Sequence, residues 1–165
     1  MLPTGTLPQG TNCCRRWPNE GFAQLKATME KAQARGRTAM ERFQLSGCGY
    51  VEFALSWPRH FVEMFDLPRV LPGSCDEEPT GMGAFGVLID GIEAAQTEGS
   101  LPTGDPLPVA LTAWSLVHGI AKLAVSGTLP MLPEKTLEFT WQATELLASG
   151  LRRQNHPEPQ QSERY

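Results

Sequence analysis

Residues 113–121 read Ala113-Trp114-Ser115-Leu116-Val117-His118-Gly119-Ile120-Ala121 and lie in a helix expected at 109–126 that is apolar on nearly every side. A helix on a protein surface needs only one apolar stripe, whereas a helix that is apolar on most sides must be covered on most sides. These residues therefore predict a helix that packs between several neighbours.

The spacing of apolar residues predicts further helices on both sides of this stretch. In each, apolar side chains recur every three or four residues, and glycine or proline marks the ends. The expected ranges are 19–36, 38–57, 59–65, 81–97 and 134–153, with loops at 68–79, 99–108 and 128–133. Because no segment shows the alternation of a strand, the fold class is predicted to be all-α, with about six helices.

The size and charge of the chain limit its class. It has 165 residues, of which 41% are hydrophobic, so one domain with a real core is expected between a disordered segment 1–18 and a flexible tail 154–165. The formal net charge of -4 offers no basic surface for a phosphate backbone. We see neither a secretory leader nor an apolar run near the length of a membrane span, and therefore expect a cytoplasmic protein without membrane contact.

Motifs for catalysis or metal binding are not recognisable. The four cysteines lack CxxC spacing, so reduced thiols are expected rather than a zinc site or a disulfide framework. The sequence contains no G-x-S-x-G, no H-E-x-x-H and no phosphate-binding glycine loop. We predict no enzymatic activity, no metal and no cofactor; a helical-bundle enzyme is the weakest alternative.

Aromatic side chains around Pro58 suggest a binding pocket, because small-molecule pockets are mostly apolar and often lie between helices. His118 belongs to the main polar line of its helix, with Ser115 and Lys122, which is expected to face water or a wet cavity. An ordinary aromatic core, and a histidine that is merely packed or solvated, are the alternative interpretation. The candidate pocket residues are Phe53, Trp57, Phe61, Met64, Phe65, Phe85, Ile89, Trp114 and His118.

The last two long helices are too apolar for a single neighbour. One neighbour is the chain's own core, and the other is expected to be a second copy in a two-fold four-helix bundle. In the alternative, the other helices of one chain cover both sides. Gly119 is costly inside a helix and predicts that another backbone or ring packs closely there. The candidate dimer residues are Leu116, Ile120, Leu123, Phe139, Ala143, Leu146 and Leu147.

Two stretches together carry a family resemblance. Tyr50-Val51-Glu52-Phe53-Ala54-Leu55-Ser56-Trp57-Pro58, followed by 61–65, and the later stretch 113–127 resemble the C-terminal domain of tetracycline-repressor (TetR) family bacterial transcriptional regulators, in the subgroup with a tryptophan-histidine-glycine signature. The resemblance covers about 19–153. It implies that the first five helices enclose a pocket for a small apolar or amphipathic effector, and that the last two form a homodimer that represses transcription.

The N-terminal helix-turn-helix domain through which this family binds DNA is not recognisable in 1–18. If the codons of 2–17 each started at their third base, the degenerate code would permit a sequence similar to the family's recognition helix. We therefore interpret 1–18 as disordered or as an out-of-frame remnant of the DNA-binding domain, which the nucleotide sequence upstream would test. DNA binding is expected only through that missing domain. The rival hypothesis is a stand-alone helical dimerisation or interaction protein with a solid core and no effector.

Overall fold

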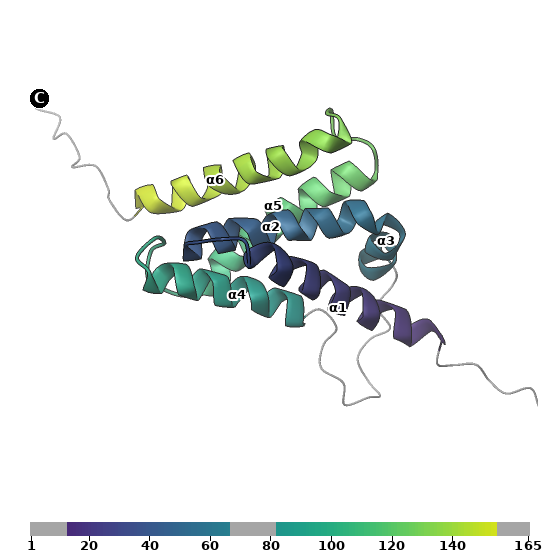
Figure 1. Cartoon of the computed structure of the whole chain (residues 1–165), viewed down its shortest axis with the longest axis horizontal. Helices are drawn as coiled ribbons and strands as arrows, with labels where there is room; N and C mark the ends of the chain where they lie inside the picture. Colours follow the sequence, from purple (N-terminus) through teal and green to yellow (C-terminus); the bar gives the residue numbers. More distant parts are fainter. Residues whose placement is uncertain (1–12, 67–81, 155–165) are drawn as a thin grey trace, which may run out of the picture.

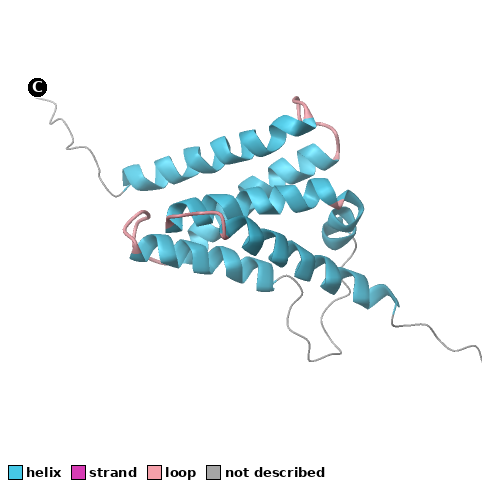
Figure 2. Cartoon of the chain, viewed as in Figure 1, coloured by secondary structure: helices cyan, strands magenta, loops and turns pink. Residues whose placement is uncertain are grey.

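A computed structural model describes residues 13–66 and 82–154, and these residues form six α-helices without a strand (Figure 2). The predicted all-α class is confirmed. Residues 1–12, the expected loop 68–79 and the tail 155–165 lie outside the described residues. The helices are α1 (Cys13–Gln33), α2 (Ala39–Ser56), α3 (Pro58–Asp66), α4 (Met82–Thr97), α5 (Pro106–Val125) and α6 (Thr136–Gln154), and the 3-10 turn η1 (Pro133–Lys135) precedes α6.

Helix α2 is the centre of the fold and packs against each of the other five α-helices (Figure 1). Two glycines allow this close packing. A Cβ atom added at Gly49 would lie 2.9 Å from Cβ of Ala32 and 3.0 Å from Cα of Met29, both on α1. A Cβ atom at Gly47 would lie 3.1 Å from Val117 on α5 and 3.2 Å from Thr144 on α6. Glycine inside a helix lowers helix propensity, and here it lets three neighbouring helices approach α2.

The boundaries of α2 follow from its end residues. The Thr38 hydroxyl accepts a hydrogen bond from the backbone N–H of Glu41 at the N-terminus, as an N-cap residue does. The predicted break at Pro58 is confirmed: Trp57 leaves the helical conformation, with φ -131° and ψ 56°, and α3 starts at Pro58. A residue that precedes proline is disfavoured in the α region, so the chain changes direction at this point.

Helix α1 begins at Cys13, six residues before the predicted start at residue 19. The prolines and glycines of 1–18 were expected to prevent any packed element. Pro18, however, lies in the second turn of α1, where its missing N–H removes one backbone hydrogen bond and the helix nevertheless continues.

Helix α5 begins at Pro106 rather than at residue 109. The Asp105 carboxylate accepts a hydrogen bond from the N–H of Leu107, and Pro106 and Pro108 occupy first-turn positions whose N–H groups need no helical partner. The helix is thus 20 residues long, and among the described helices it alone reaches the length and apolar composition of a membrane span, which corrects the sequence expectation. In the fold α5 packs against α2, α4 and α6, and 28% of the residues in its apolar window are buried.

Candidate functional site

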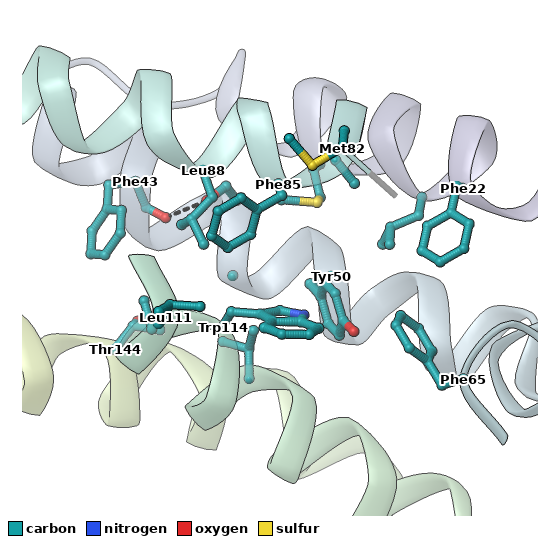
Figure 3. A pocket seen from close by; sticks show the side chains of 17 residues that line it. Phe22, Phe43, Tyr50, Phe65, Met82, Phe85, Leu88, Leu111, Trp114 and Thr144 are labelled. Atoms are coloured by element: carbon teal, nitrogen blue, oxygen red, sulfur yellow. Dashed lines mark hydrogen bonds between the residues drawn. The ribbon is translucent and has the colours of Figure 1, made fainter. Parts of the chain in front are cut away.

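An apolar cavity of about 280 Å³ lies in the core, and all six helices contribute to its wall (Figure 3). In Figure 3, Phe43 and Thr144 lie towards one end, Phe22 and Phe65 lie towards the other, and Trp114 lies between them. The lining residues are Phe22, Leu25, Met29, Phe43, Ser46, Gly47, Tyr50, Phe65, Met82, Ala84, Phe85, Leu88, Leu111, Ala113, Trp114, Val117 and Thr144.

Helical spacing brings these side chains to one place. On α1, Phe22, Leu25 and Met29 are separated by three and four residues, and so share one face. Phe43, Gly47 and Tyr50 have the corresponding spacing on α2. Gly47 lies between these two aromatic residues, and its missing side chain lets Val117 and Thr144 approach to 3.1 and 3.2 Å from where a Cβ atom would lie. The cavity thus forms where the apolar faces of packed helices meet.

Tyr50 carries the main polar group of the wall. Its hydroxyl oxygen lies 2.8 Å from Nδ1 of His118, and it accepts a hydrogen bond from the Trp114 indole N–H. Burial raises the pKa of Tyr50 well above its ordinary value of 10, and the Trp114 hydrogen bond offsets this in part. The phenol is therefore neutral and held by two partners at physiological pH.

The other two hydroxyls of the wall also bond within the chain. Ser46 Oγ donates to the Phe43 carbonyl at 2.6 Å, and Thr144 Oγ1 donates to the Trp141 carbonyl at 2.9 Å. Among the described side chains no buried nitrogen or oxygen atom lacks a hydrogen-bond partner. Since the lining residues also include no charged side chain, the wall presents mainly hydrocarbon and aromatic surface to an occupant.

Met82 and Leu111 mark the opening of the cavity. Both line it, yet Met82 is 54% exposed at the start of α4 and Leu111 is 46% exposed on α5. Phe85 and Trp114 stand behind them with ring centroids 6.1 Å apart in an edge-to-face arrangement. A molecule that passes Met82 and Leu111 therefore meets an aromatic wall.

Of the residues predicted for the pocket, the structure places Phe65, Phe85 and Trp114 on the cavity wall. Three others lie in the packed core and do not line this cavity: Phe53, Phe61 and Met64. Ile89 is half-buried against a second core cluster. The packed-core alternative thus describes the position of two of the four aromatic residues predicted around Pro58, Phe53 and Phe61, together with that of Met64.

The backbone N–H of Trp57 still donates the helical hydrogen bond to the Phe53 carbonyl, at 2.9 Å. Trp57 is, however, the C-cap of α2, with φ -131° and ψ 56°, and its side chain is not buried in the core as that of Phe53 is. The Trp57 side chain is 47% exposed and packs edge-to-face on His60 at 5.7 Å.

His118 lies behind the cavity wall rather than on it. Its ring is 4.7 Å from Phe65 and 5.5 Å from Phe61, measured between centroids, and it bonds to Tyr50. The three residues of the predicted polar line therefore lie in different surroundings. Ser115 is exposed, whereas Lys122 Nζ lies 6.0 Å from the Phe61 ring centroid. His118 positions two wall residues, Tyr50 and Trp114, from outside.

Most of the wall could not be identified from the sequence. Phe22, Leu25 and Met29 fit an ordinary amphipathic helix, and Tyr50 stands in a family motif without a predicted site role. Their apolar periodicity was visible, but periodicity identifies an inward face without showing whether that face meets another side chain or an open space.

The predicted dimer residues divide into two groups. Ile120 and Ala143 are buried within one chain. The remaining residues keep some exposure: Leu123 is 47% and Leu146 is 74% exposed, and three are half-buried, Leu116, Phe139 and Leu147. No atom lies within 4 Å of a Cβ added at Gly119, so the close neighbour predicted there is not among the described residues.

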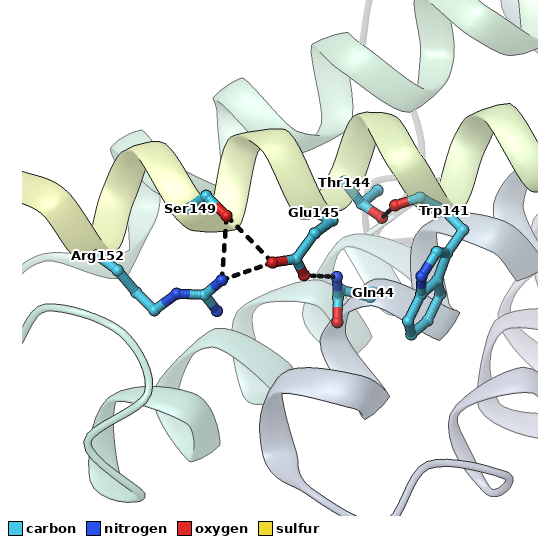
Figure 4. Close-up of polar contacts among 6 residues, drawn as sticks. All are labelled: Gln44, Trp141, Thr144, Glu145, Ser149 and Arg152. Carbon is cyan, nitrogen blue, oxygen red and sulfur yellow. Dashed lines mark hydrogen bonds and ion pairs between the residues drawn. The ribbon is translucent and has the colours of Figure 1, made fainter.

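A polar network joins α6 to α2 beside the cavity (Figure 4). The Gln44 side-chain amide donates to one Glu145 oxygen at 2.6 Å, and Arg152 donates to the other at 2.6 Å. Hydrogen bonds from Gln44, Ser149 and Arg152, together with the Arg152 charge, lower the pKa of Glu145 despite the opposing effect of desolvation. This network holds the turn of α6 that places Thr144 on the cavity wall.

The described residues contain no group of His, Cys, Asp and Glu side chains that could hold a metal ion. Cys48 is a buried free thiol, and burial raises its pKa to about 11. A protonated, buried thiol is a poor nucleophile. The described lining of the cavity therefore offers apolar and aromatic contacts and no reactive group.

Comparison with known proteins agrees with this architecture. Residues 43–146 match the family model described as "Tetracyclin repressor-like, C-terminal domain". A similar solved structure, of a protein with unknown function from Rhodococcus sp. RHA1, has a TM-score of 0.72 and 28% sequence identity over 82% of this chain and 69% of that chain. No protein of curated function matches the sequence.

Proposed function

We propose a function that starts from the family: the chain belongs to the tetracyclin repressor-like C-terminal domain family, and its described residues act as the effector-binding and dimerisation domain of a transcriptional regulator. The observation that carries the proposal is the apolar cavity enclosed by all six helices. Well-packed cores hold few voids larger than a water molecule, so a cavity of about 280 Å³ with an opening to solvent favours a binding site.

The sensing role requires that ligand binding changes the domain. A ligand shifts a conformational equilibrium only by its difference in affinity for the two states. Thr144 lines the cavity from α6, next to Glu145, which anchors α6 to α2. We propose that occupancy of the cavity shifts α6, and that this shift alters the contact with a second copy.

The dimerisation role rests on what we name the outer face of α5 and α6: Leu116, Gly119, Leu123, Phe139, Leu146 and Gly150. On α5 these residues have the spacing i, i+3 and i+7, and on α6 the spacing i, i+7 and i+11, so each set shares one side of its helix. Only 28% of the residues in the apolar window of α5 are buried within the chain. A second copy of the chain would cover this face in a four-helix bundle.

The proposal assigns sensing and dimerisation to these residues, in the cytoplasm where such regulators act, and leaves operator binding to a separate DNA-binding domain. The subgroup with a tryptophan-histidine-glycine signature is part of the proposal: Trp114 lines the cavity and His118 supports it, while Gly119 lies on the outer face. The three signature residues would thus serve the two roles from one helix.

Xenon binding tests the cavity, because apolar cavities of this kind take up xenon. We expect dissolved xenon to shift the amide resonances around Phe85 and Trp114, and Ala113→Phe to abolish the shifts. The matched control is Ala94→Phe, which adds the same ring at an exposed position of α4. If xenon shifts no resonance of these lining residues, the cavity is closed in solution and the sensing role is refuted.

Sedimentation velocity tests the dimer. We expect the chain to sediment as a dimer at micromolar concentration, and Leu146→Asp to make it monomeric, since a carboxylate would be buried without a partner. Ala94→Asp places the same charge on α4 and should leave the dimer intact. A monomeric parent chain, or a dimer unaffected by Leu146→Asp, contradicts the proposed interface.

A further inference from the structure

The cavity also indicates the kind of ligand that it accepts. None of its seventeen lining side chains carries a charge. The hydroxyls of Ser46, Tyr50 and Thr144 already bond within the chain, at 2.6, 2.8 and 2.9 Å. The wall therefore has neither a charged group nor a hydroxyl without a partner that could pair with a charged ligand.

Among the described residues, a lysine beside the opening already has a carboxylate partner. The side chain of Lys26 lies next to Gly83, since a Cβ atom built there would be 3.5 Å from Cδ of the lysine. Lys26 pairs with Glu30 at 3.6 Å on the same helix. An anionic head group near Met82 would thus meet a lysine whose charge already has a carboxylate partner.

The volume limits the size of the ligand. An engineered apolar cavity of about 150 Å³ binds benzene, and the cavity here is nearly twice as large at about 280 Å³. A volume of this size suits a ligand of about two fused aromatic rings. Six of the lining side chains are aromatic and offer edges and faces to such rings: Phe22, Phe43, Tyr50, Phe65, Phe85 and Trp114.

From these observations we infer that the effector is an uncharged aromatic compound of about two fused rings, and that carboxylates and amines of the same shape are excluded. This inference rests on the proposed effector-binding function. An ion that enters a wall without a partner loses its hydration, and in practice it neutralises before it is buried. A carboxylic acid therefore enters in its protonated form.

Equilibrium dialysis against matched probes tests the inference. Methyl 2-naphthoate and 2-naphthoate share their rings and differ in charge. A carboxyl group with a pKa near 4.3 is protonated in about one molecule in 500 at pH 7, so we expect the anion to bind at least about 100-fold more weakly than the ester. Its apparent affinity should rise about tenfold per pH unit between pH 7 and pH 5, while that of the ester stays constant.

Size and location are tested with the same assay. Methyl benzoate and the methyl ester of anthracene-2-carboxylic acid, with one and three rings, should bind at least tenfold more weakly than the two-ring ester. Ala113→Phe should abolish ester binding, and Ala94→Phe should not. Phe85→Trp changes the wall more gently and should weaken ester binding in a chain whose fold is checked by circular dichroism, in case Ala113→Phe does not fold.

The outcomes separate this inference from the proposed function. If 2-naphthoate binds as tightly as its ester at pH 7, or if the one-ring or three-ring ester binds best, the ligand class is wrong while the cavity remains a binding site. If xenon occupies the cavity and none of the esters binds, the ligand class is again refuted. If xenon finds no cavity, the proposed function and this inference both fail.

Discussion

Alanine in place of Gly49 or Gly119 gives two variants that differ only in where one methyl group is added. Both glycines lie inside helices, so each substitution gains about 1 kcal/mol of helix propensity. The methyl at Gly119 meets no atom of the described chain within 4 Å. The methyl at Gly49 would lie 2.9 Å from Cβ of Ala32 and 3.0 Å from Cα of Met29 and the carbonyl oxygen of Thr28. Two of these three atoms belong to the backbone, so a side-chain rotation cannot relieve the contact.

The propensity gain cancels when the two variants are compared. What remains is the cost of forcing α1 away from α2, which for an overpacked core is about 1–3 kcal/mol. In urea unfolding followed by circular dichroism, at a concentration where the chain is monomeric, Gly119→Ala should exceed the parent chain in stability by about 1 kcal/mol. Gly49→Ala should be about 1–3 kcal/mol less stable than Gly119→Ala.

Equal stability of the two variants would refute the close approach of α1 to α2 at Gly49. A second measurement uses the same proteins at a concentration where the dimer forms. If a second copy packs against the outer face of α5 and α6, Gly119→Ala should weaken the dimer while it stabilises the monomer. If Gly119→Ala strengthens or does not change dimerisation, the two α5 helices do not meet closely at Gly119.

Three further predictions concern buried or networked polar groups. Tyr50→Phe leaves His118 Nδ1 and the Trp114 N–H without their partner, so it should cost about 1–3 kcal/mol in urea unfolding; no loss of stability would contradict the network. With the other three cysteines replaced by serine, Cys48 should react slowly with a disulfide reagent at pH 8 and rapidly in urea, because its pKa is raised to about 11 in the folded chain. The protonated Cys48 thiol contributes to the stability of the fold below the ordinary pKa of 9.0. This contribution is lost as the pH rises from 9.0 towards 11. Glu145 has a lowered pKa, so the ionised carboxylate contributes to the stability of the fold above the ordinary pKa of 4.5, and this contribution is lost as the pH falls below that value. Glu145→Gln should flatten this part of the curve of unfolding free energy against pH. An unchanged curve would show that the network does not stabilise the fold.

The sequence was sufficient to predict the helices and the order in which they follow one another. Apolar periodicity and end residues are local properties, so the start of α2 beside Thr38 and its break at Pro58 could be predicted from neighbouring residues alone. The early starts of α1 and α5 were missed because proline was taken as a stop. Pro106 and Pro108 are tolerated because they lie in the first turn of α5, where N–H groups lack helical partners, and Pro18 in the second turn of α1 costs one hydrogen bond without ending the helix.

Composition and periodicity therefore determined the all-α class and the excess of apolar surface on the last two helices, while the motifs at 50–58 and 113–127 carried the family resemblance. The tertiary structure alone decided which apolar faces meet and where they leave space. Phe53, Phe61, Phe22 and Phe85 have the same side chain. Phe53 and Phe61 nevertheless fill the core, whereas Phe22 and Phe85 line the cavity. A side chain's hydrophobicity favours its burial, but whether it touches another side chain or an open volume depends on how helices distant in sequence pack around residues such as Gly47.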